Sequence, residues 1–489
     1  MKKWLVFILA MLCVFSVVAC SGSKKPNTQE TTQNTDDSDS AESLSPVPDD
    51  LDYNNIQINF GIREREDIAF EIDPEANSVD KMSSAISTRN ELAENKLNVD
   101  IAIRNMPGLW AQQNEYMTAV RNSDRSGGDD MLDVLFGANY SLVPLMLEGY
   151  FVNLYDSQKL QYLDLNSSWW NANFIDECSY ANKLYMVEGE LTLTMLDSAF
   201  VVFCDTVNFK NLTEGDDLYG VVRDMEWTLE KMDEYVAGFG TQDLDADQRA
   251  SNGDFFGMIS PAFSCGRDGF PTAFGVKVVS KDESGKIVPT FSKEVNVNIY
   301  SDFYRFVNEN EGVWVNGNND GAREECRNMF TNGQTVFITE LLNYASILRS
   351  QNRDYGIFPL PMYNTDQASY YTQSEAVHSQ ISVMKNSTKL EAISALLEEM
   401  GFQTHDSVLD EYYDMVKYRN NREPESVEML NLILSSVTSS FGSQFSTEIG
   451  SPFPTPIGSQ ENITSNLEGQ EDRITALMNT LKRKIQALE

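Results

Sequence analysis

Few residues of this chain have the types and spacing that enzyme chemistry needs. Its 489 residues include only two histidines, His378 and His405, and six cysteines. A catalytic cysteine needs a base such as histidine beside it, and nothing in the sequence spacing indicates that a cysteine lies beside either histidine. The 74 acidic residues could supply the two carboxylates of a glycoside hydrolase, but no motif singles out a pair. The residues alone therefore do not support an enzyme.

One acidic loop has the spacing of a calcium site. Asp243, Asp245 and Asp247 alternate, and Asp254 occupies position 12 of such a loop. Position 6, however, is Gln248 rather than glycine, and aspartate at position 12 reaches less far than the usual glutamate. Short motifs often match by chance. A solvated acidic loop is thus the preferred interpretation, and a calcium site is the alternative.

The charge balance excludes several kinds of partner. Asp and Glu number 74 against 37 Lys and Arg, so the net charge is -37. A nucleic-acid binder needs a basic footprint, and recruitment to anionic lipid by charge needs basic clusters. The 41% of hydrophobic residues is ordinary for globular chains and excludes wholesale disorder.

The N-terminus has the pattern of a bacterial lipoprotein signal. Lys2 and Lys3 precede an uncharged apolar run, Trp4–Val18, which is too short for a comfortable membrane span. The run ends in Val17–Cys20, which resembles a lipobox. We expect residues 1–19 to be a signal peptide, and Cys20 to carry acyl chains such as palmitate that anchor the protein. The alternatives are an uncleaved anchor and an ordinary signal peptide followed by an accidental cysteine.

The next segment reads as a tether. Between residues 21 and 50, apart from glycine and proline, the only apolar residues are Ala41, Leu44 and Val47. Such a segment cannot bury enough surface to offset its ordering entropy. We therefore interpret residues 20–50 as the lipidated cysteine and a disordered tether, with a folded body from about Leu51 outside the cytoplasm. There the remaining cysteines could form two disulfides or stay as buried thiols; they are Cys178, Cys204, Cys265 and Cys326.

The body opens with alternating strands and helices. This pattern predicts a parallel sheet with helices on its faces. The predicted strands are 56–60, 99–103 and 131–136, and the helices between them are 83–96 and 110–121. Further strands are expected at 183–187 and 199–204, with helices capped by Thr228 and Thr388. The last helix should place one apolar face inward, formed by Ile474, Leu477, Met478, Leu481, Ile485 and Leu488.

Four segments resemble motifs of a known family, in the family's order. They are Lys183–Glu188 ("Gly-Lys-x-Tyr-x-x-Pro"), Glu226–Lys231 ("Trp-Thr-x-Glu/Asp-Glu"), Cys326–Val336 ("Phe-x-x-Gly-x-x-Ala-Met/Phe") and Tyr355–Pro361 ("Tyr-Gly-x-x-Pro-x-Pro"). Asn182 and Glu188 depart from the first motif, where glycine and proline are usual. Behind a lipobox and a tether, the body is similar to the carbohydrate-type (family 1) solute-binding lipoproteins of bacterial ABC importers.

The resemblance implies the type II periplasmic-binding-protein fold, an α/β architecture of two lobes with a hinge and an interlobe cleft. The lobes close on ligand by hinge motion. Chain crossings are implied near 196–203, 355–361 and 401. The N-terminal lobe would comprise residues 51–196 plus 360–400, and the C-terminal lobe residues 204–355 plus 405–489.

Ligands of open α/β sheets bind beyond the carboxyl ends of the strands. That rule selects Arg63 and Glu64 after the first strand, and Asn139 and Tyr140 after the third. The resemblance adds loops with Ser260, Phe263, Glu340 and Glu375.

Aromatic rings could pack on the C–H faces of a sugar while polar side chains pair with its hydroxyls. The candidates are Trp169, Trp170 and Tyr371, each in an adjacent aromatic pair. In such a pair one ring usually belongs to the core, because neighbouring side chains of a strand point to opposite faces.

The resemblance implies a monomeric binding protein, not an enzyme, and no cofactor. It would capture a small solute, such as a mono- or oligosaccharide, and deliver it to ABC permease subunits. A secreted glycoside hydrolase, and a surface sensor or adhesin on the same fold, remain as alternatives, because fold alone does not settle function.

Overall fold

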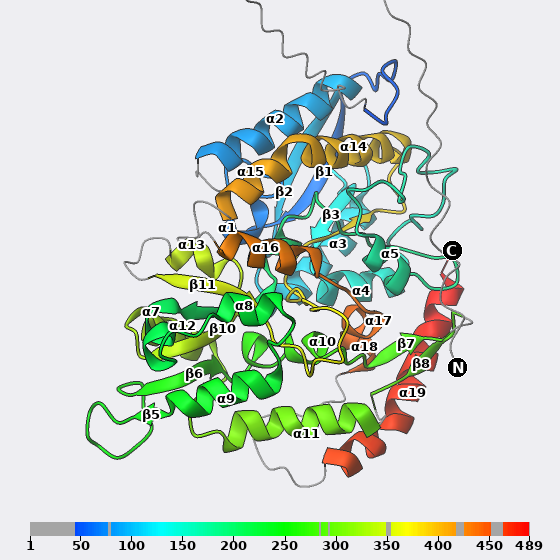
Figure 1. Cartoon of the computed structure of the whole chain (residues 1–489). Helices are drawn as coiled ribbons and strands as arrows, with labels where there is room; N and C mark the ends of the chain where they lie inside the picture. Colours follow the sequence, from blue (N-terminus) through cyan, green and yellow to red (C-terminus); the bar gives the residue numbers. More distant parts are fainter. Residues whose placement is uncertain are drawn as a thin grey trace, which may run out of the picture. The chain divides into compact units, whose positions relative to one another are not determined.

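The computed structural model describes residues 45–76, 80–282, 285–291, 294–348, 354–416, 425–450 and 463–488. The predicted signal peptide, Cys20 and most of the predicted tether lie outside these ranges. The described residues form an α/β fold around two larger sheets and a small hairpin (Figure 1). In this part of the chain, no helix is long and apolar enough to cross a membrane.

The first sheet has four strands in the order β12–β3–β1–β2. Strand β1 (Ile56–Arg63) runs parallel to β2 (Val99–Met106) and to β3 (Val134–Gly137), while β12 (Gln380–Val383) runs antiparallel to β3. The predicted parallel sheet is confirmed. Strands β1, β2 and β3 run in the same direction, so their carboxyl ends lie at one edge of the sheet. The fourth strand, β12, comes from much later in the chain.

Helices cover this sheet, and α2 and α14 lie side by side above it in Figure 1. The helices of this region are α1 (Glu66–Ala69), α2 (Asp80–Leu97), α3 (Gln113–Ser126), α4 (Asn139–Leu147), α5 (Ala172–Cys178) and α14 (Leu390–Gln403). A 3₁₀ turn at Trp110–Gln112 begins the predicted helix 110–121.

The second sheet is mixed, in the order β11–β4–β10–β6–β5, with β9 also paired to β6. Its strands are β4 (Phe200–Asp205), β5 (Thr241–Gln242), β6 (Phe255–Pro261), β9 (Val313–Asn316), β10 (Thr335–Leu341) and β11 (Tyr355–Pro359). Strands β9, β6 and β10 are parallel, and β4 is antiparallel to β10, pairing Phe200 with Leu341. The start of β4 therefore lies beside the carboxyl end of β10.

Ten helices are associated with this second half among the described residues: α6 (Thr194–Asp197), α7 (Thr206–Leu212), α8 (Leu218–Arg223), α9 (Leu229–Phe239), α10 (Phe270–Ala273), α11 (Glu294–Glu309), α12 (Asp320–Thr331), α13 (Tyr344–Leu348), α15 (Leu409–Asp414) and α16 (Ser426–Ser435). A π-helical turn, Thr404–Val408, joins α14 to α15. The predicted cap of α9 is confirmed, since the Thr228 side chain accepts a hydrogen bond from the Lys231 amide.

Two local predictions were wrong. Residues Lys183–Val187 form only isolated bridges, because Leu184 bonds with the Asn153–Leu154 loop instead of a strand partner. Helix α14 begins at Leu390 without a side-chain cap from Thr388. The Asp133 carboxylate contacts the residues before α14 instead, where it accepts hydrogen bonds from the Ser387 hydroxyl (2.6 Å) and the Lys389 ammonium (2.8 Å).

The C-terminal elements bury apolar side chains with the first sheet. They are the hairpin β7 (Val279–Lys281) and β8 (Ile287–Pro289), then α17 (Phe441–Gln444), α18 (Ser446–Ile449) and α19 (Ile463–Ala487). Val279, Phe441 and Met478 belong to the same buried cluster as Ile58 and Phe60 of β1. The sequence-based division placed these segments in the C-terminal lobe, away from this cluster.

The body starts earlier than the sequence indicated. Val47, which was placed in the tether, is only 2% exposed and packs in the same cluster as β1. Ser45 donates a hydrogen bond to the Glu399 carboxylate of α14. Ser45 and Val47, near the end of the predicted tether, thus contact the folded body.

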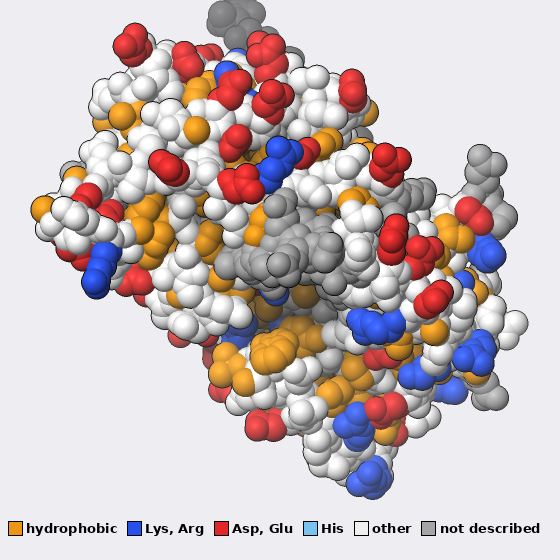
Figure 2. Space-filling view, turned by 90° about the horizontal axis from the view of Figure 1, so that it is seen from below, with side chains coloured by type: hydrophobic (Ala, Val, Ile, Leu, Met, Phe, Trp, Pro, Cys, Tyr) orange, Lys and Arg blue, Asp and Glu red, His pale blue; other side chains and the backbone are white. Residues whose placement is uncertain are grey.

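The four cysteines of the body are buried and form no disulfide in the described part of the chain. Cys178, Cys204 and Cys326 lie in three different hydrophobic clusters, so burial rather than pairing accounts for them. On the face drawn in Figure 2, acidic side chains are spread among neutral ones rather than gathered in one patch, and a recess near its middle has hydrophobic side chains along its border.

Candidate functional site

A cavity of about 540 Å³ lies where the carboxyl edges of the two sheets face each other. One side is formed by Asn139 and Tyr140, which follow β3, and the other by Phe200 at the start of β4 and by residues after β6. The loop before β12 and the segment around α17 and α18 complete the walls. The cavity thus occupies the place where open α/β sheets bind ligands.

On the first-sheet side, two polar side chains border the cavity. Asn139 and Tyr140 form the first turn of α4 and are 5% and 6% exposed. The Asn139 amide nitrogen lies 3.4 Å from the Gln444 carbonyl oxygen, to which it donates. The Asn139 Oδ1 and Tyr140 Oη atoms are buried, and neither atom forms a hydrogen bond with another described residue. Such groups are rare in folded proteins and usually have a partner outside the chain.

The opposite side combines aromatic rings with one charged pair. Phe200, Tyr300 and Phe303 contribute rings, and Arg267 Nε lies 2.8 Å from the Asp268 carboxylate. Burial raises the pKa of Asp268, and Arg267 opposes that shift. Apolar rings next to a few polar groups are the usual composition of a ligand site.

The loop before β12 crosses the cavity and connects both halves. Gln373 accepts a hydrogen bond from the Thr272 hydroxyl, and the Ser264 hydroxyl donates to the Glu375 carboxylate. Burial raises the pKa of Glu375, with Arg323 and Ser264 acting in the opposite direction. The Phe200 amide in turn donates to the Gln373 carbonyl.

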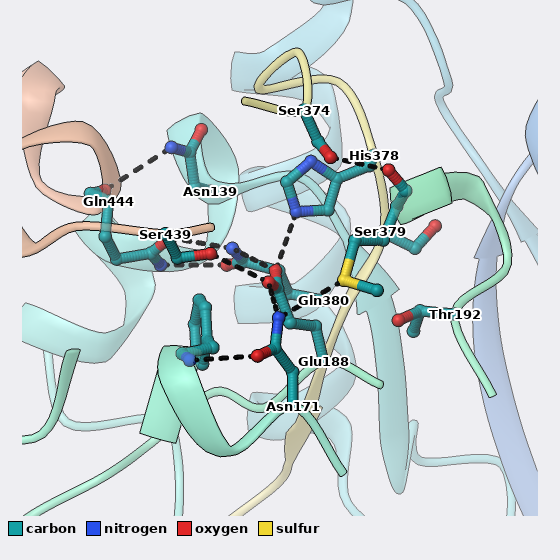
Figure 3. Close-up of polar contacts among 12 residues, drawn as sticks. Asn139, Asn171, Glu188, Thr192, Ser374, His378, Ser379, Gln380, Ser439 and Gln444 are labelled. Carbon is teal, nitrogen blue, oxygen red and sulfur yellow. Dashed lines mark hydrogen bonds and ion pairs between the residues drawn. The ribbon is translucent and has the colours of Figure 1, made fainter. Parts of the chain in front are cut away.

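A buried polar network supports this loop from below (Figure 3). His378 Nε2 lies 2.8 Å from the Glu188 carboxylate, and His378 Nδ1 lies 2.7 Å from the Glu375 carbonyl oxygen. Asn171 and Ser439 each donate to the other Glu188 oxygen at 3.0 Å. Glu188 departs from the family motif, and here it fixes the loop that borders the cavity.

The same network continues to the C-terminal wall. The side-chain amides of Gln380 and Gln444 exchange two hydrogen bonds of 2.7 and 2.8 Å. Through these residues β12 holds the end of α17, so the cavity wall from Ser440 to Gly450 is fixed to the first sheet.

Three of the predicted site residues border the cavity: Asn139, Tyr140 and Glu375. Arg63 lies next to it but is 1% exposed, and its Nη2 donates to the carbonyl of Val377, which is a wall residue. The structure places the other candidates elsewhere.

The predicted aromatic candidates do not border this cavity. Trp170 is buried and donates to Glu398 (3.1 Å), and Trp169 packs against Phe402 with ring centroids 6.0 Å apart. Phe263 and Tyr371 are half-buried outside the cavity wall.

The remaining polar candidates are committed to other contacts or exposed away from the wall. Glu340 is 1% exposed and accepts bonds from Arg323 (2.6 Å) and Arg327 (3.0 Å). Ser260 is buried and hydrogen-bonds Thr339 (2.8 Å), and Glu64 is exposed beyond β1.

The acidic loop brings three of its four carboxylates together. Oxygens of Asp243, Asp245 and Asp247 lie within 4.8 Å of one another, on exposed side chains. Asp254 is 1% exposed and instead accepts bonds from the Leu244 and Ser251 amides. The calcium alternative would therefore have to do without the position-12 ligand in this arrangement.

Sequence reasoning missed several wall residues. Trp110 is 64% exposed and borders the cavity; it follows the carboxyl end of β2, so the strand-end rule could have selected it. Arg267 follows β6 in the same way. Tyr300 and Gly442 gave no such signal, because a helix side and a distant C-terminal segment bring them to the site.

Other hollows are larger or similar in size but lie away from the sheet edges. One of about 840 Å³ lies between α9 and α11, and one of about 580 Å³ adjoins α16. Neither has wall residues from the first sheet or its carboxyl edge.

This fold is that of solved sugar-binding and ABC substrate-binding proteins, which the chain matches over about 90% of its length. An ABC substrate-binding protein from Listeria monocytogenes, in complex with cycloalternan, is 13% identical with a TM-score of 0.51, over 90% of this chain and 100% of that one. The GacH receptor of Streptomyces glaucescens, studied unliganded and with acarbose, is 13% identical with a TM-score of 0.51, over 88% and 99%. A cyclo/maltodextrin-binding protein with maltotetraose is 10% identical with a TM-score of 0.52, over 89% and 98%.

No protein-family model matches the chain, and no curated protein matches it by sequence. At these identities the structural likeness shows the fold, and the fold predicted from the four motifs is confirmed.

Proposed function

We propose that this chain is the solute-binding component of an ABC importer, and that it captures a sugar in the cavity between its sheets. The observation that supports this best is the cavity itself, with rings from Trp110, Tyr300 and Phe303 and polar groups from Asn139 and Gln373. Sugars need both kinds of surface, since their C–H faces pack on rings and their hydroxyls need donors and acceptors.

The ligands of the structural neighbours are consistent with this proposal. The proteins named above bind cycloalternan, acarbose and maltotetraose. The shared fold brings no chemistry of its own, so we propose that the solute is released unaltered to permease subunits in the membrane.

We further propose that the protein is a monomer held outside the cytoplasm by acyl chains on Cys20, after removal of residues 1–19. Acyl chains at one cysteine, followed by a polar tether, would keep the body near a permease. Mass spectrometry of protein from membranes should find diacylglycerol on an N-terminal Cys20, and an unmodified Cys20 would refute the anchor.

The principal test is ligand-dependent stability of the mature body. Binding to the native state raises the melting temperature, so a panel of mono- and oligosaccharides, peptides and polyols should contain a sugar that raises it. Chromatography should recover that sugar unchanged. Turnover would instead support the glycoside hydrolase alternative, in which Asp268 and Glu375 would be the acidic residues of the cavity.

Trp110 offers a sharper test at the same site. We expect Trp110→Ala to weaken sugar binding by at least tenfold, since it removes an exposed ring at the cavity edge. Ile347→Ala is a matched control, because Ile347 is 50% exposed on α13, away from the cavity. Titration calorimetry giving equal affinities for the two variants would contradict the assignment of this cavity.

A further inference from the structure

Arg63 is a buried cation with no acidic partner. It ends β1, is 1% exposed, and forms no ion pair within 4.0 Å with any carboxylate of the described residues. Its Nη2 donates to the Val377 carbonyl and, at 3.2 Å, to Ser379 Oγ. Its Nε and Nη1 atoms are buried and have no hydrogen-bond partner in the protein. Leaving a buried charge uncompensated is costly, so a partner from outside the chain is expected.

Other unpartnered polar atoms gather at the same place. Tyr116 Oη, Tyr140 Oη and Asn139 Oδ1 are buried without a hydrogen bond. Tyr116 and Tyr140 lie near Arg63, and the Tyr116 hydroxyl lies against Gly137 at the end of β3. These side chains come from β1, α3 and the start of α4, and all lie at the carboxyl edge of the first sheet.

This group adjoins the ligand cavity. Asn139, Tyr140 and Val377 form part of the cavity wall, and Val377 also accepts the Arg63 bond. Each of the two unpartnered guanidinium donors, Nε and Nη1, can form a charge-assisted hydrogen bond to an oxygen of a carboxylate or phosphate. A neutral hydroxyl group would leave the buried charge uncompensated.

We propose that Arg63, Tyr140 and Asn139 form a deeper subsite of the cavity, which binds an anionic group of the solute, either a carboxylate or a phosphate. The solute is then an acidic sugar. This inference rests on the proposed function and names the substrate class of the same site. Because the unpartnered atoms have almost no exposed surface, side chains of the cavity wall must move for the anionic group to reach them.

Burial lowers the pKa of Arg63, and Glu71 is among the nearby groups that oppose this shift. One of the Glu71 oxygens accepts a bond from the Thr194 amide at 3.0 Å, and the other is buried without a partner. Burial raises the pKa of Glu71, with Ser379, Thr194 and Arg63 opposing.

The test compares matched sugars on the mature protein by calorimetry and thermal shift. The probes are glucose with glucuronate, galactose with galacturonate, glucose with glucose 6-phosphate, and inorganic phosphate alone. We expect the acidic member of at least one pair to bind tenfold or more tightly than its neutral partner. Preference for uronates or for the phosphate ester distinguishes the two anionic groups.

Single substitutions test which side chains bind the anionic group. Tyr140→Phe keeps the ring and removes one donor, so it should weaken the acidic sugar by about tenfold and leave the neutral partner nearly unchanged. Arg63→Lys keeps the charge but removes the Nε and Nη1 donors of the planar guanidinium, and should weaken binding further. The control is Tyr185→Phe, since the Tyr185 hydroxyl is also buried without a partner but lies away from the cavity.

The outcomes separate this inference from the proposed function. Neutral sugars binding as tightly as acidic ones, or Tyr140→Phe behaving like Tyr185→Phe, would overturn the anionic subsite and leave sugar capture standing. Phosphate binding that depends on Tyr140, with no sugar bound at all, would support the subsite and refute the sugar. No binding by any probe would refute both.

Discussion

At the scale of single residues, Glu188 and His378 show how one departure from a motif acquires a role. Glu188 accepts bonds from Asn171 and Ser439 as well as contacting His378. Burial alone would lower the pKa of His378, but Glu188 and the Glu375 carbonyl raise it above its ordinary value of 6.5. The pair therefore favours the charged imidazolium inside the protein.

This shift predicts a pH dependence of stability. The pKa of His378 is higher in the folded protein than in the unfolded chain, where it is near 6.5. The protonated histidine therefore stabilises the fold fully below pH 6.5, and this stabilisation is lost as the pH rises through the pKa of the folded state. Urea unfolding of the wild type and His378→Gln should thus differ most at pH 5.5–6.5, by about 1–3 kcal/mol, and less at pH 9. His405→Gln, which removes a more exposed pair with Glu190, should show a much smaller difference. An equal difference for His378→Gln at every pH would contradict the assignment.

Glu340 illustrates a buried charge whose partners come from the chain itself. Burial raises the pKa of Glu340, yet Arg323 and Arg327 outweigh it and hold the pKa below its ordinary value. Removing the charge would leave two arginines with no carboxylate between them. We expect Glu340→Gln to cost about 3–5 kcal/mol in the free energy of unfolding at pH 7.

The destabilisation by Glu340→Gln should become smaller as the pH falls. The pKa of Glu340 is lower in the folded protein than the value of 4.5 in the unfolded chain, so the charged carboxylate stabilises the fold fully only above pH 4.5. This stabilisation is lost as the pH falls through the pKa of the folded state. The control is Glu428→Gln, whose partner Arg223 is exposed. Denaturant midpoints of wild type and Glu428→Gln should nearly coincide. A similar midpoint for Glu340→Gln would show that the buried triad contributes no net stability.

At the scale of elements, the strand-to-helix junctions position the site. Gly137 ends β3, Ala138 is extended, and α4 then begins with Asn139 and Tyr140. A Cβ at residue 137 would lie 2.7 Å from the Tyr116 hydroxyl, so glycine allows α3 to approach this junction. The side chains that line the cavity are thus set by a turn of a few residues.

Helix α9 offers a quantitative test of an element boundary. The Thr228 hydroxyl accepts the Lys231 amide at 3.2 Å, and Thr228→Ala should cost about 1 kcal/mol. Thr118→Ala is the matched control, because Thr118 lies inside α3 and its hydroxyl bonds only the Asn114 carbonyl. Thermal unfolding should show a lower midpoint for the first variant and little change for the second. Equal midpoints would mean that Thr228 is not the cap.

At the scale of the whole molecule, α19 binds to both halves of the fold. Its first part buries Leu467 and Ile474 with Tyr300 and Tyr304 of α11. Its second part buries Met478, Leu481 and Ile485 with the core of the first sheet. One helix therefore packs on both sides of the cavity, and any closing motion must move it or bend it.

Ile474 tests this arrangement. Ile474→Ala should cost about 2–5 kcal/mol, because Ile474 is fully buried. Hydrogen exchange should then speed up in the first half of α19 and in α11, with less change beyond Met478. Thr480→Ala, on the exposed side of the same helix, should leave exchange unchanged. Uniform acceleration along α19 would indicate that the helix acts as one unit rather than as two separate contacts.

Sequence patterns located those parts of the site that local structure dictates. Asn139 and Tyr140 could be predicted because they follow a buried strand, and strand ends in a parallel sheet share one edge. Arg63 followed from the same rule, although its burial and its free donors did not. Trp169 and Trp170 were plausible as an aromatic pair, but whether a ring enters a core or a cavity depends on packing that no local pattern records.

The periodicities of the sequence determined the parallel strands β1, β2 and β3 and the helices between them, and the resemblance of four motifs implied the two-lobed fold. Tertiary structure alone decided which distant segments meet at the cavity: the loop before β12, the wall near α17, and Tyr300 of α11. It also decided that α19 packs on α11 with its first part and on the core of the first sheet with its second part. The physical reason is that repeating patterns reflect contacts between near neighbours, whereas a cavity forms between elements hundreds of residues apart, where burial and charge depend on the whole fold.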